Sequence, residues 1–116
     1  MAVALFMRIP ELSIDRYDRM MVGLELDAKP PAGVILHIAT EAVGCVNVCE
    51  IWQTPQAAES FVEHRLHDAL RSQGVKDPLS YRIEPLHNLF APDLDMIDRI
   101  GSVSLPAGLA HTALAS

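Results

Sequence analysis

A chain of 116 residues, half of them apolar, has the size of one domain with a hydrophobic core. Its net charge of -6, with nine scattered Lys and Arg residues, argues against nucleic-acid binding, which needs a basic patch. No apolar run approaches the ~20 residues of a membrane span, yet the mean hydropathy of +0.20 is high for a chain this short. We therefore expect a homo-oligomer that buries the additional apolar surface.

The N-terminal segment has the pattern of a strand and not that of a targeting signal. Residues Ala2–Arg8 form a short apolar run with Pro10 just after it, which is typical of a first strand. A secretory signal begins with basic residues and continues in an apolar stretch, whereas this segment reaches Arg8 and Glu11 early. We expect a cytoplasmic protein.

A first helix is predicted to begin after Ser13, whose hydroxyl suits the N-cap, with Asp15 in the first turn. Apolar residues then recur at helical spacing on one face: Ile14, Tyr17, Met21 and Leu24. Two consecutive prolines prevent the helix from continuing through Ala28–Gly33, which we interpret as a linker.

The segment Gly33–Gln53 predicts two strands joined by a turn at Glu41–Gly44. On the second of these strands the apolar residues alternate between two faces: Val46, Val48 and Trp52 on one face, Cys45, Cys49 and Ile51 on the other. Both faces should therefore be covered. Two helices cover only one face of such a sheet, and the simplest cover for the other is the same sheet of a second copy.

Cys45 and Cys49 lie on one face of this strand, about 13 Å apart at ~3.3 Å per residue. That separation is too large for a disulfide between them. Because no ligand histidine lies at a suitable spacing, they do not form a zinc motif either. We interpret them as small buried apolar residues in a reducing compartment.

Thr54-Pro55 predicts the start of a second helix, with Thr54 as N-cap and Pro55 at the first helical position, and Gly74 predicts its end. Its inward face should consist of Ala58, Phe61, Val62, Leu66, Ala69 and Leu70. His64 and His67 fall on the opposite side, so we interpret them as solvated and not as a metal site.

A turn at Asp77-Pro78 precedes the predicted fourth strand, Ser80–Leu89. The order β-α-β-β-α-β is that of a ferredoxin-like α+β sandwich, which we assign to residues 1–90. Residues 91–116 form a C-terminal extension, with a short helix at Pro92–Ile100 and extended chain at Gly101–Leu105. This extension either wraps over the partner subunit or frays.

Three pieces of the sequence resemble the antibiotic-biosynthesis-monooxygenase-like dimeric α/β-barrel proteins: GVILHIA at 33–39, EIWQTPQAAESF at 50–61 and HNLF at 87–90. The resemblance covers about residues 1–90. It implies a homodimer whose two four-stranded sheets pack into a barrel, with a ligand cavity between sheet and helices in each subunit. Proteins of this architecture include cofactor-free oxygenases, polyketide cyclases and haem-degrading enzymes, so fold alone does not assign the chemistry.

The predicted hairpin places a histidine near a carboxylate. If the turn centres on Ala42-Val43, His37 faces Val48 and lies diagonal to Glu50; a shift of two residues puts His37 directly across from Glu50. Either register places His37, Glu50 and Trp52 on one face of the sheet.

An imidazole beside a carboxylate can act as a general base, with the carboxylate fixing its tautomer. We therefore predict His37 and Glu50 as catalytic residues; the alternative is a satisfied polar pair that only sets the register. We expect the fourth strand at one edge of the sheet, on the side of the second strand, so that His87 approaches the same cavity and is a further catalytic candidate; a place in a dimer interface is the alternative for this residue. The candidate substrate-binding residues are Trp52, Tyr17, Met21, Asn88 and Phe61, although Trp52 and Tyr17 also suit the core.

Motifs for nucleotide binding, serine hydrolysis and zinc proteolysis are missing from the sequence, and we expect no metal and no cofactor. The resulting hypothesis is a cofactor-free monooxygenase or cyclase for a hydrophobic aromatic or polyketide-like molecule. A non-catalytic small-molecule-binding protein of the same fold is the alternative. A haem-handling protein would require His64 or His67 to face inward, against the helical pattern.

Overall fold

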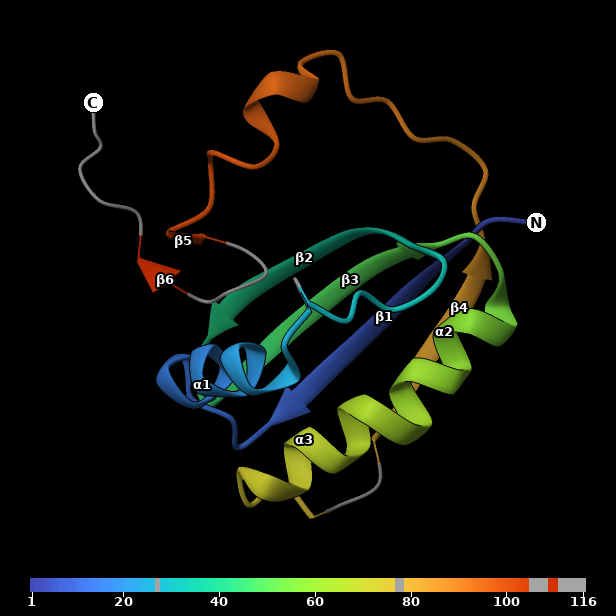
Figure 1. The fold of residues 1–116 in the computed structure, drawn as a ribbon. Helices are drawn as coiled ribbons and strands as arrows, with labels where there is room; N and C mark the ends of the chain where they lie inside the picture. Colours follow the sequence, from blue (N-terminus) through green and yellow to red (C-terminus); the bar gives the residue numbers. More distant parts are fainter. Residues whose placement is uncertain (27, 77–78, 105–108, 111–116) are drawn as a thin grey trace.

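The structure, a computed structural model, describes residues 1–26, 28–76, 79–104 and 109–110. A four-stranded antiparallel sheet carries its long helices on one face (Figure 1). In chain order the elements of this unit are β1 (Val3–Pro10), α1 (Ile14–Leu24), β2 (Val34–Ala42), β3 (Cys45–Trp52), α2 (Pro55–Phe61), α3 (His67–Ser72) and β4 (Tyr81–Pro85). This order confirms the predicted ferredoxin-like α+β arrangement.

The strands lie in the order β2-β3-β1-β4. The prediction that the fourth strand lies beside the second is therefore wrong, because β4 pairs with β1 at the opposite edge of the sheet. The fourth strand is also shorter than predicted. The last residue pair between β4 and β1 is Pro85 with Val3. One further hydrogen bond follows, from Leu86 N–H to the Ala2 carbonyl at 3.0 Å. The pairing ends there because β1 lies at the N-terminus and offers no further residues.

The hairpin between β2 and β3 has the second of the two predicted registers. A two-residue connection, Val43-Gly44, joins Ala42 to its partner Cys45, and this pairing sets His37 directly opposite Glu50. Gly44 has φ +74°, a left-handed conformation that glycine adopts without steric cost. A bulge at Ile35 shifts the register near the start of β2.

The predicted cap starts α1. The Ser13 side chain accepts a hydrogen bond from Arg16 N–H at 3.2 Å. The helix buries a face made of Tyr17, Met20, Met21 and Leu24. Every predicted member of this face except half-buried Ile14 is buried, and Met20 joins it.

The second helical segment also begins as predicted, with the Thr54 hydroxyl accepting from Ala57 N–H at 3.1 Å. It is not one uniform α-helix, because a π-helical turn, Val62–Leu66, separates α2 from α3. In that turn the His67 N–H bonds to the Val62 carbonyl, five residues back. The predicted inward face is confirmed: Ala58, Phe61, Val62, Leu66 and Leu70 are buried and Ala69 is half-buried.

The C-terminal segment leaves β4 and runs on the side of the sheet away from α1, α2 and α3 (Figure 1). It contains a 3-10 turn at Leu94–Met96 where a short helix was predicted, and two short paired strands, β5 (Val103–Ser104) and β6 (Leu109–Ala110). Large apolar side chains along it are exposed: Leu89, Phe90, Leu94, Met96, Ile97 and Ile100. None of the described helices is long and apolar enough to cross a membrane.

Candidate functional site

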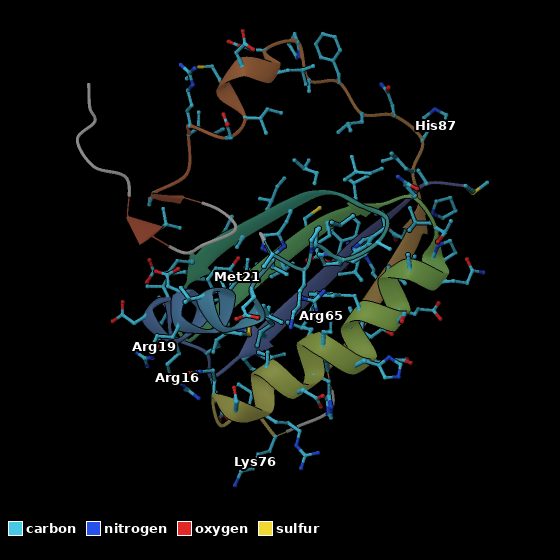
Figure 2. All side chains as sticks on the ribbon, in the orientation of Figure 1. Arg16, Arg19, Met21, Arg65, Lys76 and His87 are labelled. Carbon is cyan, nitrogen blue, oxygen red and sulfur yellow. The ribbon has the colours of Figure 1, made fainter. Side chains whose placement is uncertain are left out.

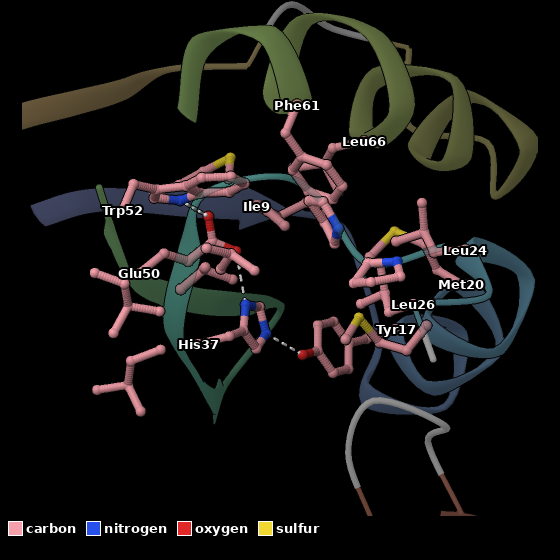
Figure 3. Close-up of a pocket in the computed structure, with 18 residues that line it drawn as sticks. Ile9, Tyr17, Met20, Leu24, Leu26, His37, Glu50, Trp52, Phe61 and Leu66 are labelled. Atoms are coloured by element: carbon pink, nitrogen blue, oxygen red, sulfur yellow. Dashed lines mark hydrogen bonds and ion pairs between the residues drawn. The ribbon is translucent and has the colours of Figure 1, made fainter. Parts of the chain in front are cut away.

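A cavity of about 240 Å³ lies between the helix-covered face of the sheet, α1, α2 and the linker that precedes β2 (Figure 3). Its walls are mostly apolar. They include Met7 and Ile9 from β1, Met20 and Leu24 from α1, and Phe61 and Leu66 from the ends of α2 and the π-helical turn. The polar groups among the described lining residues are contributed by Tyr17, His37, Glu50 and Trp52.

These four side chains form one continuous chain of hydrogen bonds (Figure 3). The Trp52 indole N–H donates to Glu50 Oε1 at 2.9 Å. Glu50 Oε2 lies 2.6 Å from His37 Nδ1, and His37 Nε2 lies 2.6 Å from the Tyr17 hydroxyl oxygen. The chain connects α1, β2 and β3, so its geometry depends on how the helix packs on the sheet.

The acceptors in this chain fix the positions of the protons. An indole nitrogen only donates, so Glu50 accepts from Trp52 with one oxygen and offers the other to His37. In a neutral imidazole Nδ1 then carries the hydrogen that bonds to Glu50, and Nε2 has the lone pair. Tyr17 O–H is therefore the donor to His37 Nε2.

The burial of this hydrogen-bond chain affects its chemistry. Glu50 is 4% exposed and Tyr17 is 3% exposed, whereas the His37 side chain retains 21% exposure. Burial, and then the negative charge of Glu50, raise the pKa of Tyr17 well above its ordinary value of 10.0. The phenol therefore remains a proton donor throughout the physiological pH range.

The linker that closes one side of the cavity is held by Arg65. Its guanidinium donates to the Lys29 carbonyl at 2.7 Å and to the Leu24 carbonyl at 2.8 Å. At the other end of the linker, Gly33 has φ +90°, and a β-carbon there would lie 3.0 Å from that of Ala57. Glycine is thus required where the linker enters β2, close to Pro30 and Pro31 in the cavity wall.

Six of the predicted site residues meet at this cavity: His37, Glu50, Trp52, Tyr17, Met21 and Phe61. The sequence did not predict that Tyr17 bonds directly to His37, nor that Met20 and Leu24 line the cavity. Met20 had a signal, since Tyr17, Met20, Met21 and Leu24 follow the i, i+3, i+4, i+7 spacing of one helical face. The sequence holds no signal for the role of Arg65, because its backbone carbonyl partners are brought together only by the tertiary fold.

His87 and Asn88 lie elsewhere. Both are exposed on the segment after β4, and neither lines the cavity. Figure 2 shows His87 beyond the end of β4, far from Met21 on α1. The expected approach of His87 to the cavity is wrong because β4 occupies the opposite edge of the sheet from β2.

The two helical histidines also stay outside the cavity. His64 is exposed and its Nδ1 bonds to the Ser60 carbonyl at 2.8 Å; His67 is half-buried. Neither side chain belongs to the described cavity lining, which leaves a bound haem without an axial histidine from this helix. Within the described residues, no group of three or more His, Cys, Asp and Glu side chains is arranged to hold a metal ion.

By sequence, the chain matches no family model and no curated protein. Three solved structures show the similarity of the fold. A candidate antibiotic biosynthesis monooxygenase from Chloroflexus aurantiacus matches with TM-score 0.53 and 13% identity, over 78% of this chain and 98% of that one. A protein of unknown function from Nitrosomonas europaea matches with TM-score 0.60 and 13% identity, over 78% and 94%.

The third structure is SnoaB, a cofactor-independent oxygenase from Streptomyces nogalater, in a mutant form. It matches with TM-score 0.56 and 6% identity, over 76% of this chain and 95% of that one. At these identities the matches establish a shared fold and carry no residue roles. The chain has the ferredoxin-like fold of the antibiotic biosynthesis monooxygenase-like proteins, as its sequence pattern predicted.

Proposed function

We propose that this chain is a cofactor-independent enzyme of the monooxygenase or cyclase type, in which His37 is the general base and Glu50 orients it. The substrate is a small hydrophobic aromatic or polyketide-derived molecule with an acidic O–H or C–H group. The observation that carries the proposal is the Glu50–His37–Tyr17 hydrogen-bond chain at the wall of an otherwise apolar cavity. The shared fold with a cofactor-independent oxygenase supports the same reaction class.

The size of the cavity limits the substrate. A cavity of about 150 Å³ accommodates benzene, and drug-sized ligands occupy about 300–1,000 Å³. A volume of about 240 Å³ therefore favours a molecule of one or two rings over a larger polycyclic one.

The charge of the cavity lining also limits the charge that a substrate can carry. No Lys or Arg belongs to its described lining, and Glu50 is the acidic residue there. A carboxylate or phosphate ligand would lose its hydration without gaining a cationic partner, which is costly in an apolar site. These properties favour a neutral substrate such as a phenol or an enolisable ketone.

The reaction would begin with proton removal. Loss of a proton from the phenol or from an acidic carbon gives an electron-rich anion, while His37 becomes an imidazolium that Glu50 stabilises at 2.6 Å. In a monooxygenase, O2 would then add to a carbon of the anion to form a hydroperoxide; with the substrate as electron donor, one oxygen atom would remain as a carbonyl and the other would leave with the removed protons as water. In a cyclase, an electrophilic carbon of the same molecule would form the new bond to the anion instead. The mostly apolar walls would limit the access of water to both reactions.

The test is turnover by the wild type and a His37→Ala variant on a panel of one- and two-ring phenols and enolisable ketones, followed by oxygen uptake and product analysis. We expect His37→Ala to abolish turnover and to leave the fold and oligomeric state unchanged. His64→Ala is the matched control, because that exposed histidine lies outside the cavity. Full activity in His37→Ala would contradict the mechanism.

The same panel distinguishes the alternative of a non-catalytic binding protein. Such a protein would bind members of the panel without turnover. His37→Gln would then change their affinity little, because no step would require a titrating imidazole.

We also propose a cytoplasmic homodimer in which the uncovered faces of two sheets meet and residues 91–116 extend over the partner subunit; of this extension, residues 105–108 and 111–116 lie outside the described structure. Two observations support it. Ile38 on the uncovered face is 46% exposed. The segment after β4 runs on that side of the sheet (Figure 1), and several of its large apolar side chains are exposed. A second copy of the chain would cover both.

A further inference from the structure

Both ring nitrogens of His37 already have partners. Nδ1 lies 2.6 Å from Glu50 Oε2, and Nε2 lies 2.6 Å from the Tyr17 hydroxyl (Figure 3). A base that takes a proton directly from a ligand must present a free lone pair to it. As long as Tyr17 donates to Nε2, no lone pair of His37 is available to a molecule in the cavity.

Tyr17 is held firmly in this position. Its side chain is 3% exposed on the buried face of α1. Its ring plane is nearly parallel to that of His37, with an angle of 9° between the planes and 6.2 Å between the centroids. Removing the hydroxyl from Nε2 would require this buried ring, a member of the hydrophobic core with Met20 and Met21, to move. A ligand therefore contacts the hydrogen-bonded Tyr17–His37 pair and does not displace Tyr17 from it.

The Tyr17 oxygen still has capacity to accept a hydrogen bond. A phenolic oxygen donates one hydrogen bond and accepts through its lone pairs. Among the described residues its hydrogen-bond partner is His37 Nε2, which uses the donor only. Tyr17 also lines the cavity, so a molecule bound there lies beside this residue.

We propose that Tyr17 is the catalytic residue that contacts the substrate, and that it relays the substrate proton to His37. This inference rests on the proposed role of His37 as the base. The substrate O–H bond breaks and its proton passes to the Tyr17 oxygen, while the original Tyr17 proton passes to His37 Nε2. The products of the step are a substrate anion that accepts a hydrogen bond from neutral Tyr17, and an imidazolium paired with Glu50.

The electrostatics of the site favour simultaneous movement of the two protons. A free Tyr17 phenolate would be buried near the negative charge of Glu50, and both factors raise the pKa of this phenol. Tyr17 is therefore neutral before and after the step. The charge that develops is placed on the substrate and on His37, where Glu50 and its Trp52 hydrogen bond are already oriented to stabilise it.

A chromophoric phenol can test this relay without a known substrate. The probe is 4-nitrophenol, with 4-nitro-1-naphthol as a two-ring counterpart, because the phenol and phenolate forms of each have different absorption bands. Each is titrated into wild type, His37→Gln, Tyr17→Phe and Tyr81→Phe at a pH where the free probe is mostly protonated. Tyr81→Phe is the matched control, since the Tyr81 hydroxyl bonds to Glu63 at 3.2 Å and lies outside the cavity.

The relay predicts the phenolate band for probe bound to wild type and to Tyr81→Phe, and loss of that band in both His37→Gln and Tyr17→Phe. Tyr17→Phe should retain binding with an affinity loss of about tenfold or less, because one hydrogen bond is removed. Circular dichroism and thermal unfolding verify that each variant is folded. Loss of the band with retained binding in a folded Tyr17→Phe protein supports the relay.

A phenolate band that persists or strengthens in Tyr17→Phe but disappears in His37→Gln would overturn the relay and leave His37 as a direct base. A phenolate band that persists in His37→Gln, or a wild type that binds the probes only as phenols, would overturn the proposed function and the relay with it. Failure of the wild type to bind either probe would overturn the assignment of the cavity as a site for phenols.

Discussion

The polar side chains on the two faces of the four-stranded sheet differ in burial and in hydrogen bonding. On the face covered by the helices, Glu50 is 4% exposed and bonds to both His37 and Trp52. On the other face, Arg82 and Glu84 are more than half exposed, with a 3.4 Å contact between them. Arg82 also lies over the ring of Phe6 at 4.4 Å.

The difference follows from access to water. A polar group removed from water must find hydrogen-bond partners inside the protein, whereas an exposed one exchanges partners with solvent at little cost. The covered face therefore specifies one arrangement of its polar side chains, as preorganised chemistry requires. The uncovered face, which we propose as the dimer interface, specifies no such arrangement.

Removing one carboxylate from each face should show this contrast most strongly. Glu50→Ala would leave the Trp52 N–H and the His37 Nδ1–H without their acceptor, and each unpaired buried donor costs about 1–3 kcal/mol. We expect the free energy of unfolding to fall by about 2–4 kcal/mol. Glu84→Ala, which removes an exposed partner, should change it by about 0.5 kcal/mol or less.

Chemical denaturation of both variants at one protein concentration measures the difference. Equal losses would mean that the hydrogen-bond chain on the covered face contributes no more to stability than an exposed ion pair.

A charge placed on the uncovered face should act on assembly and leave the cavity intact. Ile38 is 46% exposed there, on the opposite side of β2 from His37. Burying a carboxylate in the proposed interface is costly, so Ile38→Glu should weaken self-association at least about tenfold and leave thermal unfolding of the monomer nearly unchanged. Sedimentation velocity over a range of protein concentrations measures the self-association, with Val43→Glu at the exposed hairpin turn as control.

An unchanged sedimentation profile for Ile38→Glu would contradict the proposal that this face joins two copies. A wild type that remains monomeric at all concentrations would contradict it as well.

At alkaline pH the buried Tyr17 phenol should lower the free energy of unfolding, by less than the loss expected for Glu50→Ala. The pKa of Tyr17 is raised in the folded state, whereas in the unfolded chain it is close to 10. Below about pH 10 both states bind the proton; above it the unfolded state loses the proton first, so the free energy of unfolding falls as pH rises. The contribution of Tyr17 is up to about 1.4 kcal/mol per pH unit.

Urea denaturation between neutral pH and about pH 11 measures this slope. Tyr17→Phe should make the slope shallower by the contribution of this one group. A slope that is the same in the wild type and in Tyr17→Phe would mean that Tyr17 ionises as easily in the folded protein as in the unfolded chain.

Local signals predicted most of the fold. Ser13 and Thr54-Pro55 mark both helix starts because their capping interactions lie within three residues. Alternation along the strands placed His37, Glu50 and Trp52 on one face, since this property depends only on the period of the strand. The β-α-β-β-α-β order followed from these elements.

The errors concern contacts between distant segments. The position of β4, and with it that of His87, depends on which edge of β1 remains free after β3 has paired, and periodicity holds no such information. The choice between two hairpin registers depended on the turn residues Val43-Gly44. The bond between Tyr17 and His37 depends on how closely α1 packs on the sheet, which no local pattern encodes.

The position of the proton on neutral His37 is decisive, because both the proposed base and the proposed relay depend on it. Nitrogen-15 NMR of the imidazole, assigned with the His37→Gln variant, reports which ring nitrogen carries the proton in the neutral form. We predict that Nδ1 carries the proton toward Glu50 and that Nε2 is an unprotonated acceptor for the Tyr17 hydroxyl. A neutral His37 with its proton on Nε2 would contradict both the base and the relay.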